Sequence, residues 1–285
     1  METSFKLIEC PRDALQGFPK WVATPQKIEY YQQLLKVGFD TLDCGSFVSP
    51  KAVPQMIDTA QVIAGLDCSQ TKTKLLVIVA NLRGAQEAVK YEKISYLGYP
   101  FSISENFQMR NTGKTIEESV PLLKEIIRLS DAVQKEVVVY LSMGFGNPYG
   151  DPWSPQIIKE KVAQLATMGI KIFSLSDTVG SARPEDVQML FSHLSETYPN
   201  LEFGAHFHTH PKTWFEKVNA AFLGGCKRFD GTIKGRGGCP MAQNHLVGNM
   251  PTEKLISFFT TRKCLPNIDL LAFESAFNTS HSIFI

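Results

Sequence analysis

Short runs of β-branched and aromatic residues alternate along this chain with longer stretches of helical period, and this alternation constrains the fold most. We expect eight strands, at residues 5–10, 41–45, 74–80, 93–98, 137–142, 171–176, 202–208 and 228–233. Strands separated by helices pair in parallel through right-handed crossovers. Eight such units before residue 240 favour a closed (β/α)₈ TIM barrel over an open doubly wound sheet, which would carry a glycine-rich turn after its first strand.

Capping signals predict where several helices begin and end. Thr115 is followed three residues later by Glu118, which is the spacing of a capping box. Thr24 and Ser154 each precede a proline and pair a capping hydroxyl with proline at the first helical position. The glycines expected to end helices in the left-handed conformation are Gly38, Gly169 and Gly224.

The composition is that of one soluble barrel domain. Of the 285 residues, 44% are hydrophobic and 20% are charged, which excludes a disordered chain and a long coiled coil. We expect a catalytic barrel over residues 1–265 and a short helical C-terminal addition over residues 266–285. A formal net charge of +1, with no basic run, gives no indication of a surface that binds nucleic acid or an anionic membrane. No apolar run is long enough to span a membrane.

The cysteines indicate a reducing compartment. All 6 are scattered, without the spacing of a disulfide framework or a zinc ribbon. The N-terminus lacks the basic and then apolar order of a secretory signal. We therefore expect reduced, mostly buried thiols and a cytoplasmic protein.

Polar residues concentrate where the predicted strands end. The active site of a TIM barrel lies at this C-terminal rim, so these residues are candidates for catalysis and substrate binding. They are Arg12, Asp13, Gln16, Asp43, Ser46, Ser142, Asn147, Asp177, His206, His208, Arg236 and Cys239.

The histidine pair is the sharpest of these signals. His206 and His208 are two residues apart on one predicted strand, so both imidazoles point to the same face. Together with a carboxylate such as Asp13, they make a mixed nitrogen and oxygen site for a divalent cation. The alternative is a polar edge strand with two solvent-facing histidines.

Two further residues have both a chemical and a structural interpretation. Arg12 can stabilise a developing oxyanion beside a metal-binding Asp13, or the two can form an ordinary ion pair at a strand end. Cys239 lies in a glycine-rich segment that can fold over the site, whereas a single cysteine is otherwise an inert buried thiol.

Several longer motifs resemble the hydroxymethylglutaryl-CoA (HMG-CoA) lyase family of metal-dependent barrels. The resemblance extends from about residue 6 to about residue 260. Its most specific pieces are P-R-D-A-L-Q at 11–16, S-F-V-S-P-K-A-V-P-Q-M at 46–56, N-L-R-G at 81–84, S-L-S-D-T-V-G at 174–180, H-F-H at 206–208 and G-G-C-P at 237–240. The second and last of these pieces favour the lyases over the related synthases.

The resemblance implies a role for each matching residue. Asp13, His206, His208 and Asn249 would bind Mg²⁺ or Mn²⁺, with Asn244 as the alternative to Asn249. Asp43 would join Arg12 and Asp13 in the signature triad of the superfamily. Arg12 would stabilise the enolate of the departing acetyl-CoA, and Cys239 would take part in proton transfer. Asp177 would lie near the substrate hydroxyl, and Gln16 would contact the substrate or its surroundings.

The implied reaction is retro-Claisen cleavage of HMG-CoA, or a related 3-hydroxy-acyl-CoA, to acetyl-CoA and acetoacetate. The resemblance also implies a homodimer. Two alternatives remain. One is a Claisen-type synthase or a 4-hydroxy-2-oxo-acid aldolase of the same superfamily. The other is a catalytically weakened barrel that binds an acyl-CoA.

The chain departs from the family pattern around the substrate. Asp43 replaces a glutamate, and Gly17-Phe18-Pro19 replaces a polar stretch that can contact an anionic substrate. The usual G-L-G-G before the cysteine is Gly235-Arg236-Gly237-Gly238 here. Arg236 is therefore a candidate for an added phosphate or carboxylate contact.

Overall fold

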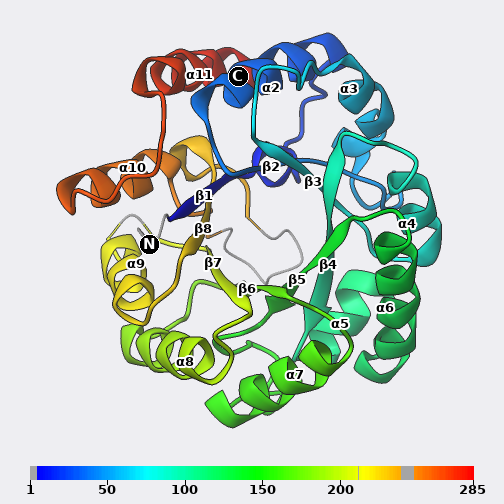
Figure 1. The fold of residues 1–285 in the computed structure, drawn as a ribbon, viewed down its shortest axis with the longest axis vertical. Coiled ribbons are helices and arrows are strands. Elements are labelled where there is room, and N and C mark those ends of the chain that lie inside the picture. Colours follow the sequence, from blue (N-terminus) through cyan, green and yellow to red (C-terminus); the bar gives the residue numbers. More distant parts are fainter. Residues whose placement is uncertain (1–4, 211, 239–246) are drawn as a thin grey trace.

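The eight predicted strands close into a parallel barrel in chain order (Figure 1). A computed structural model describes residues 5–210, 212–238 and 247–285. The strands are β1 (Lys6–Glu9), β2 (Thr41–Ser46), β3 (Lys74–Ile78), β4 (Ile94–Ser102), β5 (Glu136–Ser142), β6 (Ile172–Asp177), β7 (Glu202–Phe207) and β8 (Arg228–Gly231). β8 pairs with β1, so the sheet has no free edge. The predicted (β/α)₈ barrel is confirmed.

Helices surround the barrel as an outer ring (Figure 1). The α-helices are α1 (Pro11–Leu15), α2 (Thr24–Val37), α3 (Thr59–Gly65), α4 (Leu82–Ala88), α5 (Glu105–Thr112), α6 (Ile116–Asp131), α7 (Pro155–Thr167), α8 (Pro184–Thr197), α9 (Trp214–Leu223), α10 (Thr252–Thr261) and α11 (Leu270–Ile283). Two 3₁₀ turns are η1 (Pro54–Met56) and η2 (Ile233–Gly235). α11 packs beside α2, far from it in sequence. None of the described helices is long and apolar enough to cross a bilayer.

Two capping predictions are confirmed. Thr115 accepts a hydrogen bond from the backbone N–H of Glu118, whose side chain accepts one from the N–H of Thr115. Ser154 accepts from the N–H of Ile157 at the start of α7. The prediction for Thr24 is wrong, because Thr24 is the first residue of α2 itself and its hydroxyl donates to Asp58 at 2.8 Å.

The end of α9 also differs from the prediction. Gly224 has an ordinary φ of −74°, and the left-handed residue is Gly225, with a φ of 88°. Gly224 is required for packing instead, since a Cβ atom there would lie 2.7 Å from the Cβ of Phe191 on α8. A close approach of two helices and a helix stop therefore use neighbouring glycines.

The centre of the barrel is only partly apolar. Leu76, Val138 and Ile172 point inward, but so does Arg228, which is fully buried. Gly204 on β7 makes room for it, because a Cβ atom there would lie 2.9 Å from the Cδ of Arg228. Barrel interiors are usually filled by branched apolar residues, so a buried guanidinium is a departure.

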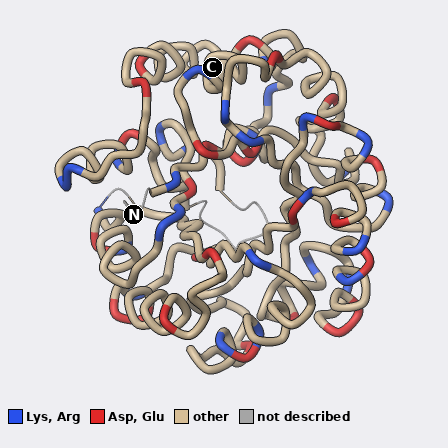
Figure 2. The backbone as a smooth tube through the Cα atoms, viewed as in Figure 1, with Lys and Arg blue, Asp and Glu red and all other residues tan. Residues whose placement is uncertain are grey.

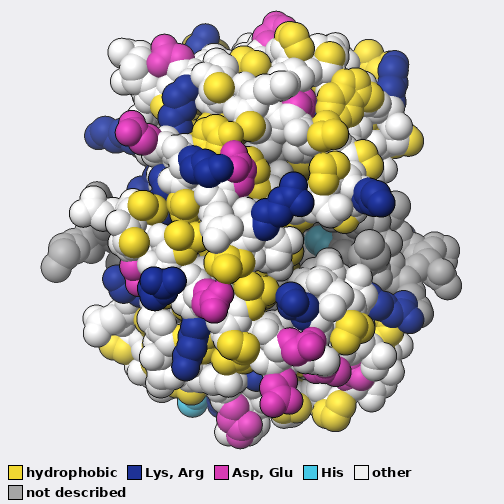
Figure 3. Space-filling model, turned by 90° about the vertical axis from the view of Figure 1, so that its right-hand side faces the viewer, with side chains coloured by type: hydrophobic (Ala, Val, Ile, Leu, Met, Phe, Trp, Pro, Cys, Tyr) yellow, Lys and Arg dark blue, Asp and Glu magenta, His cyan; other side chains and the backbone are white. Residues whose placement is uncertain are grey.

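Arg228 is held by carboxylates at the N-terminal end of the barrel. Its Nη1 lies 3.2 Å from Oε1 of Glu202 and 3.7 Å from Oδ1 of Asp40. Most charged residues lie instead along the outer helices (Figure 2). On the face shown in Figure 3, basic, acidic and apolar side chains intermingle, in agreement with the nearly balanced net charge.

Candidate active site

A cavity of about 400 Å³ opens at the C-terminal ends of the strands. This is the rim at which the sequence predicts the site. The predicted residues that line the cavity are Arg12, Asp13, Gln16, Ser46, Ser142, His206 and His208. The structure therefore brings together residues that are up to 196 positions apart in the chain.

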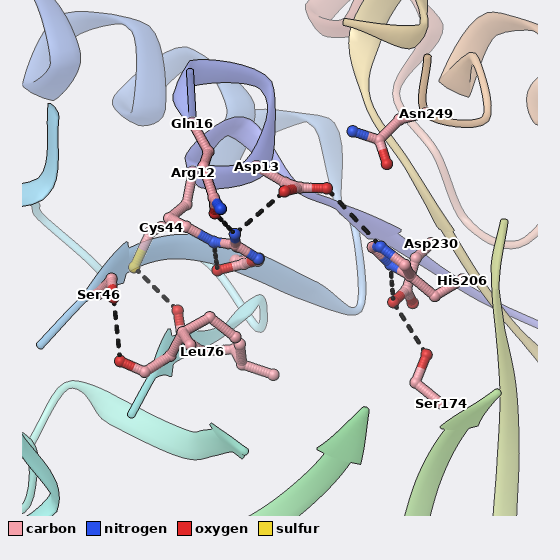
Figure 4. Close-up of polar contacts among 12 residues, drawn as sticks. Arg12, Asp13, Gln16, Cys44, Ser46, Leu76, Ser174, His206, Asp230 and Asn249 are labelled. Carbon is pink, nitrogen blue, oxygen red and sulfur yellow. Dashed lines mark hydrogen bonds and ion pairs between the residues drawn. The ribbon is translucent and has the colours of Figure 1, made fainter. Parts of the chain in front are cut away.

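Arg12 makes a two-pronged contact with Asp43. Its Nε lies 3.0 Å from Oδ2 and 3.2 Å from Oδ1 of Asp43, and its Nη2 lies 2.5 Å from Oδ2. Nη1 donates to Asp13 at 3.1 Å and to Gln16 at 2.7 Å (Figure 4). The shorter carboxylate of Asp43 thus reaches the guanidinium that the family's glutamate would be expected to meet.

Asp43 is fully buried and contacts the cavity-lining Arg12 without lining the cavity itself, whereas Ser46 lines it. An irregularity in β2 brings both residues to the same side of the strand. The register between β2 and β3 shifts between Asp43 and Gly45, which inserts one residue into the ladder. Residues three positions apart would otherwise point to opposite faces. The inserted Cys44 lies outside the cavity, with its thiol against the carbonyl oxygen of Leu76.

Burial and the opposite charges act against each other on both members of the Arg12–Asp43 pair. Burial raises the pKa of Asp43 to about 6, although the guanidinium of Arg12 opposes the shift. Burial alone would lower the pKa of Arg12, but the charges of Asp43 and Asp13 outweigh it and raise that pKa. Arg12 is therefore a permanent cation in the wall of the cavity.

Asp13, His206 and His208 form a compact cluster. One possible ligand atom from each lies within 4.8 Å of the others. The Nε2 of His206 is 3.7 Å from Oδ2 of Asp13, and this carboxylate oxygen is buried without a hydrogen-bond partner. An unpaired buried carboxylate oxygen facing an imidazole nitrogen is the donor set of a divalent cation site.

Both imidazoles are oriented by their other nitrogen. Nδ1 of His206 donates to Oδ2 of Asp230 at 3.1 Å, and Nδ1 of His208 donates to the carbonyl oxygen of Thr178 at 2.7 Å. Each Nε2 then carries the free lone pair that a cation requires. Figure 4 shows His206 between the carboxylates of Asp13 and Asp230, with one ring nitrogen toward each.

The two histidines differ in basicity. Burial lowers the pKa of His206, but the hydrogen bond and charge of Asp230 outweigh burial, so the net shift is upward. Burial and then the nearby charge of His206 lower the pKa of His208. Asp13 keeps a lowered pKa, because Arg12, His206 and His208 together outweigh its burial.

Asn249 joins this cluster from the segment after the glycine-rich turn. It forms a backbone bridge with His208, is 3% exposed and lies near Asp13 and His206 in Figure 4. Its Nδ2 donates to the carbonyl oxygen of Arg236 at 2.9 Å, which leaves the amide oxygen as the atom able to bind a cation. The residues present therefore fit a divalent metal ion.

The structure does not bring Asp177 to the cavity. Ser176 and Thr178 line it, so the intervening Asp177 points away from it. The carboxylate of Asp177 accepts hydrogen bonds from Lys217 at 2.6 Å and from the backbone N–H of Ser181 at 2.9 Å. Asp177 thus ties β6 to α9 rather than facing the substrate.

Two other predicted residues, Asn147 and Arg236, do not line this cavity. The side chain of Asn147 does not line the cavity and accepts hydrogen bonds from the backbone of Tyr149 and Asp151, which fixes its own loop. Arg236 lines a neighbouring cavity. Cys239 lies outside the described residues, as does Asn244.

The sequence reasoning missed Asp230. It lies directly opposite His206 in the β7–β8 ladder, and Ser174 also donates to its carboxylate, at 3.2 Å. The signal was available, because Asp230 lies in a predicted strand next to the one that carries the histidines. Tyr140 was missed as well, and its ring meets that of His206 edge to face at 5.4 Å.

A closed barrel whose mouth holds a histidine–carboxylate cluster beside a buried guanidinium has the design of a TIM-barrel enzyme. The chain is a member of the HMGL-like family, whose model matches residues 6–279. The resemblance found in the sequence is confirmed.

Named relatives and solved structures agree with this membership. Hydroxymethylglutaryl-CoA lyase YngG of Bacillus subtilis is 33% identical over 93% of this chain and 88% of its own length. The cytoplasmic 3-hydroxy-3-methylglutaryl-CoA lyase of Rattus norvegicus is 32% identical over 93% of this chain and 77% of its own. An HMG-CoA lyase from Acinetobacter baumannii, solved with coenzyme A and 3-methylmalate, superposes with a TM-score of 0.92 at 30% identity, covering 100% of this chain and 92% of that one.

Proposed function

We propose that this protein is a carbon–carbon lyase that cleaves HMG-CoA to acetyl-CoA and acetoacetate. The observation that carries the proposal is the cluster of Asp13, His206 and His208 beside Arg12 in a single cavity. Relatives named as HMG-CoA lyases cover most of the chain, and a related lyase was solved with coenzyme A. The substrate class is therefore an acyl-CoA.

Asp13, His206, His208 and Asn249 are the proposed ligands for Mg²⁺ or Mn²⁺. Oxygen-rich sites with imidazole suit such ions, and the free atoms described above supply this donor set. When bound, the ion lowers the pKa of the substrate C3 hydroxyl. The hydrogen bonds from His206 to Asp230 and from His208 to Thr178 hold the ligands in place beforehand.

Cleavage removes a proton from the C3 hydroxyl, shifts two electron pairs and returns a proton to C2. Loss of the C3 hydroxyl proton to a base starts the step, and the electron pair of the O–H bond forms the ketone of acetoacetate. The C2–C3 bond breaks, and its electrons form the enolate of acetyl-CoA. Arg12, fixed by Asp43 and Gln16, stabilises the negative charge on the thioester oxygen. A proton returned to C2 completes acetyl-CoA, and Cys239 is the proposed donor.

Acetoacetate release from HMG-CoA by the purified protein tests this function. Release that depends on Mg²⁺ or Mn²⁺, and is lost with EDTA and in Asp13→Ala, is the expected result. The synthase and aldolase alternatives predict turnover only with their own substrates. Metal binding without turnover of any 3-hydroxy-acyl-CoA would replace the lyase by the acyl-CoA-binding barrel.

We also propose a cytoplasmic homodimer. The five cysteines in the described ranges are unpaired, in keeping with a reducing compartment, and one relative is named as cytoplasmic. The homodimer follows from the family resemblance. Light scattering on the purified protein measures the oligomeric state directly.

A further inference from the structure

A second cavity, of about 500 Å³, lies next to the active site. Gln16 lines both cavities and accepts a hydrogen bond from Arg12. The two cavities therefore share part of one wall. One side is formed by Gly17, Phe18 and Pro19, and the other by the turn at Lys234 and Arg236. We call this second space the basic cavity.

Two cations, Lys234 and Arg236, line the basic cavity, and neither side chain forms an ion pair with a described residue. The Nε of Arg236 is buried without a hydrogen-bond partner in the described ranges. Burial, followed by the positive charge of Arg236, lowers the pKa of Lys234, while the negative charge of Glu253 opposes the shift. The two charges repel each other, and a bound anion would relieve this repulsion.

Aromatic rings, not carboxylates, hold these cations in place. The Nζ of Lys234 lies 4.8 Å from the ring centre of Phe277, and the guanidinium of Arg236 lies 4.7 Å from that of Phe284. A ring face positions a cation without neutralising its charge. Both groups are thus ordered and still able to bind an anion.

The backbone between them is also specialised. Lys234 has a φ of 64°, which is rare for a residue with a Cβ atom, and its N–H is held by Glu253 at 3.0 Å. Gly235 follows with a φ of 62°, and a Cβ atom there would lie 2.7 Å from the carbonyl oxygen of Asn249. Non-glycine residues in this conformation are concentrated at binding and active sites.

We propose that the basic cavity is an anion subsite that takes a phosphate group from the nucleotide end of the acyl-CoA, with Lys234 and Arg236 as its binding residues. This inference rests on the proposed function, which places the acyl end in the adjacent cavity. Lys234 and Arg236 are the charged members of the described lining of this cavity, so no lining carboxylate competes with an anion there. A carboxylate on a larger acyl group has the same recognition chemistry and is distinguished by experiment.

Kinetics with a full and a truncated substrate test the proposal. Lys234→Met and Arg236→Met should each raise the KM for HMG-CoA about tenfold with kcat unchanged. The KM for HMG-pantetheine, which lacks the nucleotide, should not change. Lys254→Met is the matched control, because Lys254 also faces an aromatic ring, that of Trp214 at 5.9 Å, but does not line the cavity. An unchanged KM for HMG-CoA in both variants would overturn the subsite.

Direct binding separates failure of this proposal from failure of the proposed function. Calorimetry with 3′,5′-ADP should show binding to the wild type that weakens about tenfold in Lys234→Met and in Arg236→Met. This result in a protein that does not cleave HMG-CoA would leave the subsite standing and reject the lyase. Weaker binding of glutarate, with that of 3′,5′-ADP unaltered, would reject the phosphate in favour of a carboxylate.

Discussion

The carboxylate of Asp230 accepts a hydrogen bond from the Nδ1 atom of His206 at 3.1 Å, on the side of the ring opposite Asp13. This contact fixes which imidazole nitrogen faces the metal-ligand cluster. The charge of Asp230 also makes the imidazole a better electron donor. Asp230 does not line the cavity, yet it sets the orientation of His206, a proposed metal ligand.

Asp230→Asn should weaken Mn²⁺ binding about 10- to 100-fold, because the neutral amide holds the imidazole less firmly. Calorimetric titration of the metal-free protein with Mn²⁺ measures the effect. Ser174→Ala is the control, since it removes a neighbouring hydrogen bond to Asp230 and leaves the contact with His206 intact. Equal affinities of Asp230→Asn and wild type would show that Asp230 does not orient the ligand.

Asp43→Glu should impair the protein, although glutamate is the family residue at this position. The shorter carboxylate already lies 2.5–3.2 Å from the guanidinium of Arg12, so an added methylene must displace one of the two groups. We expect a loss of about 1–3 kcal/mol in the free energy of unfolding and of roughly tenfold or more in kcat. Urea unfolding and steady-state kinetics measure the two effects. A gain in both would mean that β2 accommodates the longer side chain.

Glu9 should make the protein less stable as pH rises. It is fully buried, accepts hydrogen bonds from Thr252 at 2.5 Å and from the N–H of Ile233 at 2.9 Å, and burial raises its pKa from 4.5 to about 8. The folded state therefore binds more protons than the unfolded state between these two values. The stability that comes from this group is full below pH 4.5 and is lost as pH rises towards 8.

Glu9→Gln tests this dependence, because the amide resembles the protonated acid. Its free energy of unfolding should fall less between pH 5 and pH 8 than that of the wild type, by up to about 4 kcal/mol. Urea unfolding at the two pH values measures the difference. Parallel pH profiles for the two proteins would exclude Glu9 as the source.

Lys217→Met should destabilise the fold without a specific effect on catalysis. It removes the cation 2.6 Å from the buried carboxylate of Asp177, which is then left charged and unpaired, at a cost of about 3–5 kcal/mol. The KM for HMG-CoA should be unchanged at a temperature where the variant is folded. A large change in kcat without loss of stability would show that Asp177 has a role in the reaction.

The alternation of strand-like and helical segments was enough to predict the closed barrel, and strand parity was enough to bring His206 and His208 to one cavity. The same parity would have excluded Asp177, whose neighbours Ser176 and Thr178 line the site. The sequence pattern alone could not predict the inserted residue in β2, because that irregularity depends on how β2 pairs with β3. That Lys234 and Arg236 line one cavity and form no ion pair with a described residue was equally hidden, since this is a property of the folded surface.

Arg228 connects the two ends of the barrel. Its Nη1 meets Glu202 at 3.2 Å, while its Nε lies 3.9 Å from the Oδ1 of Asp230, the residue that holds His206. In most TIM barrels the face opposite the active site serves stability alone. Here a screen of random variants for lost activity should also recover substitutions at Glu202 and Asp40, although both lie at the N-terminal end of the barrel, far from the active site.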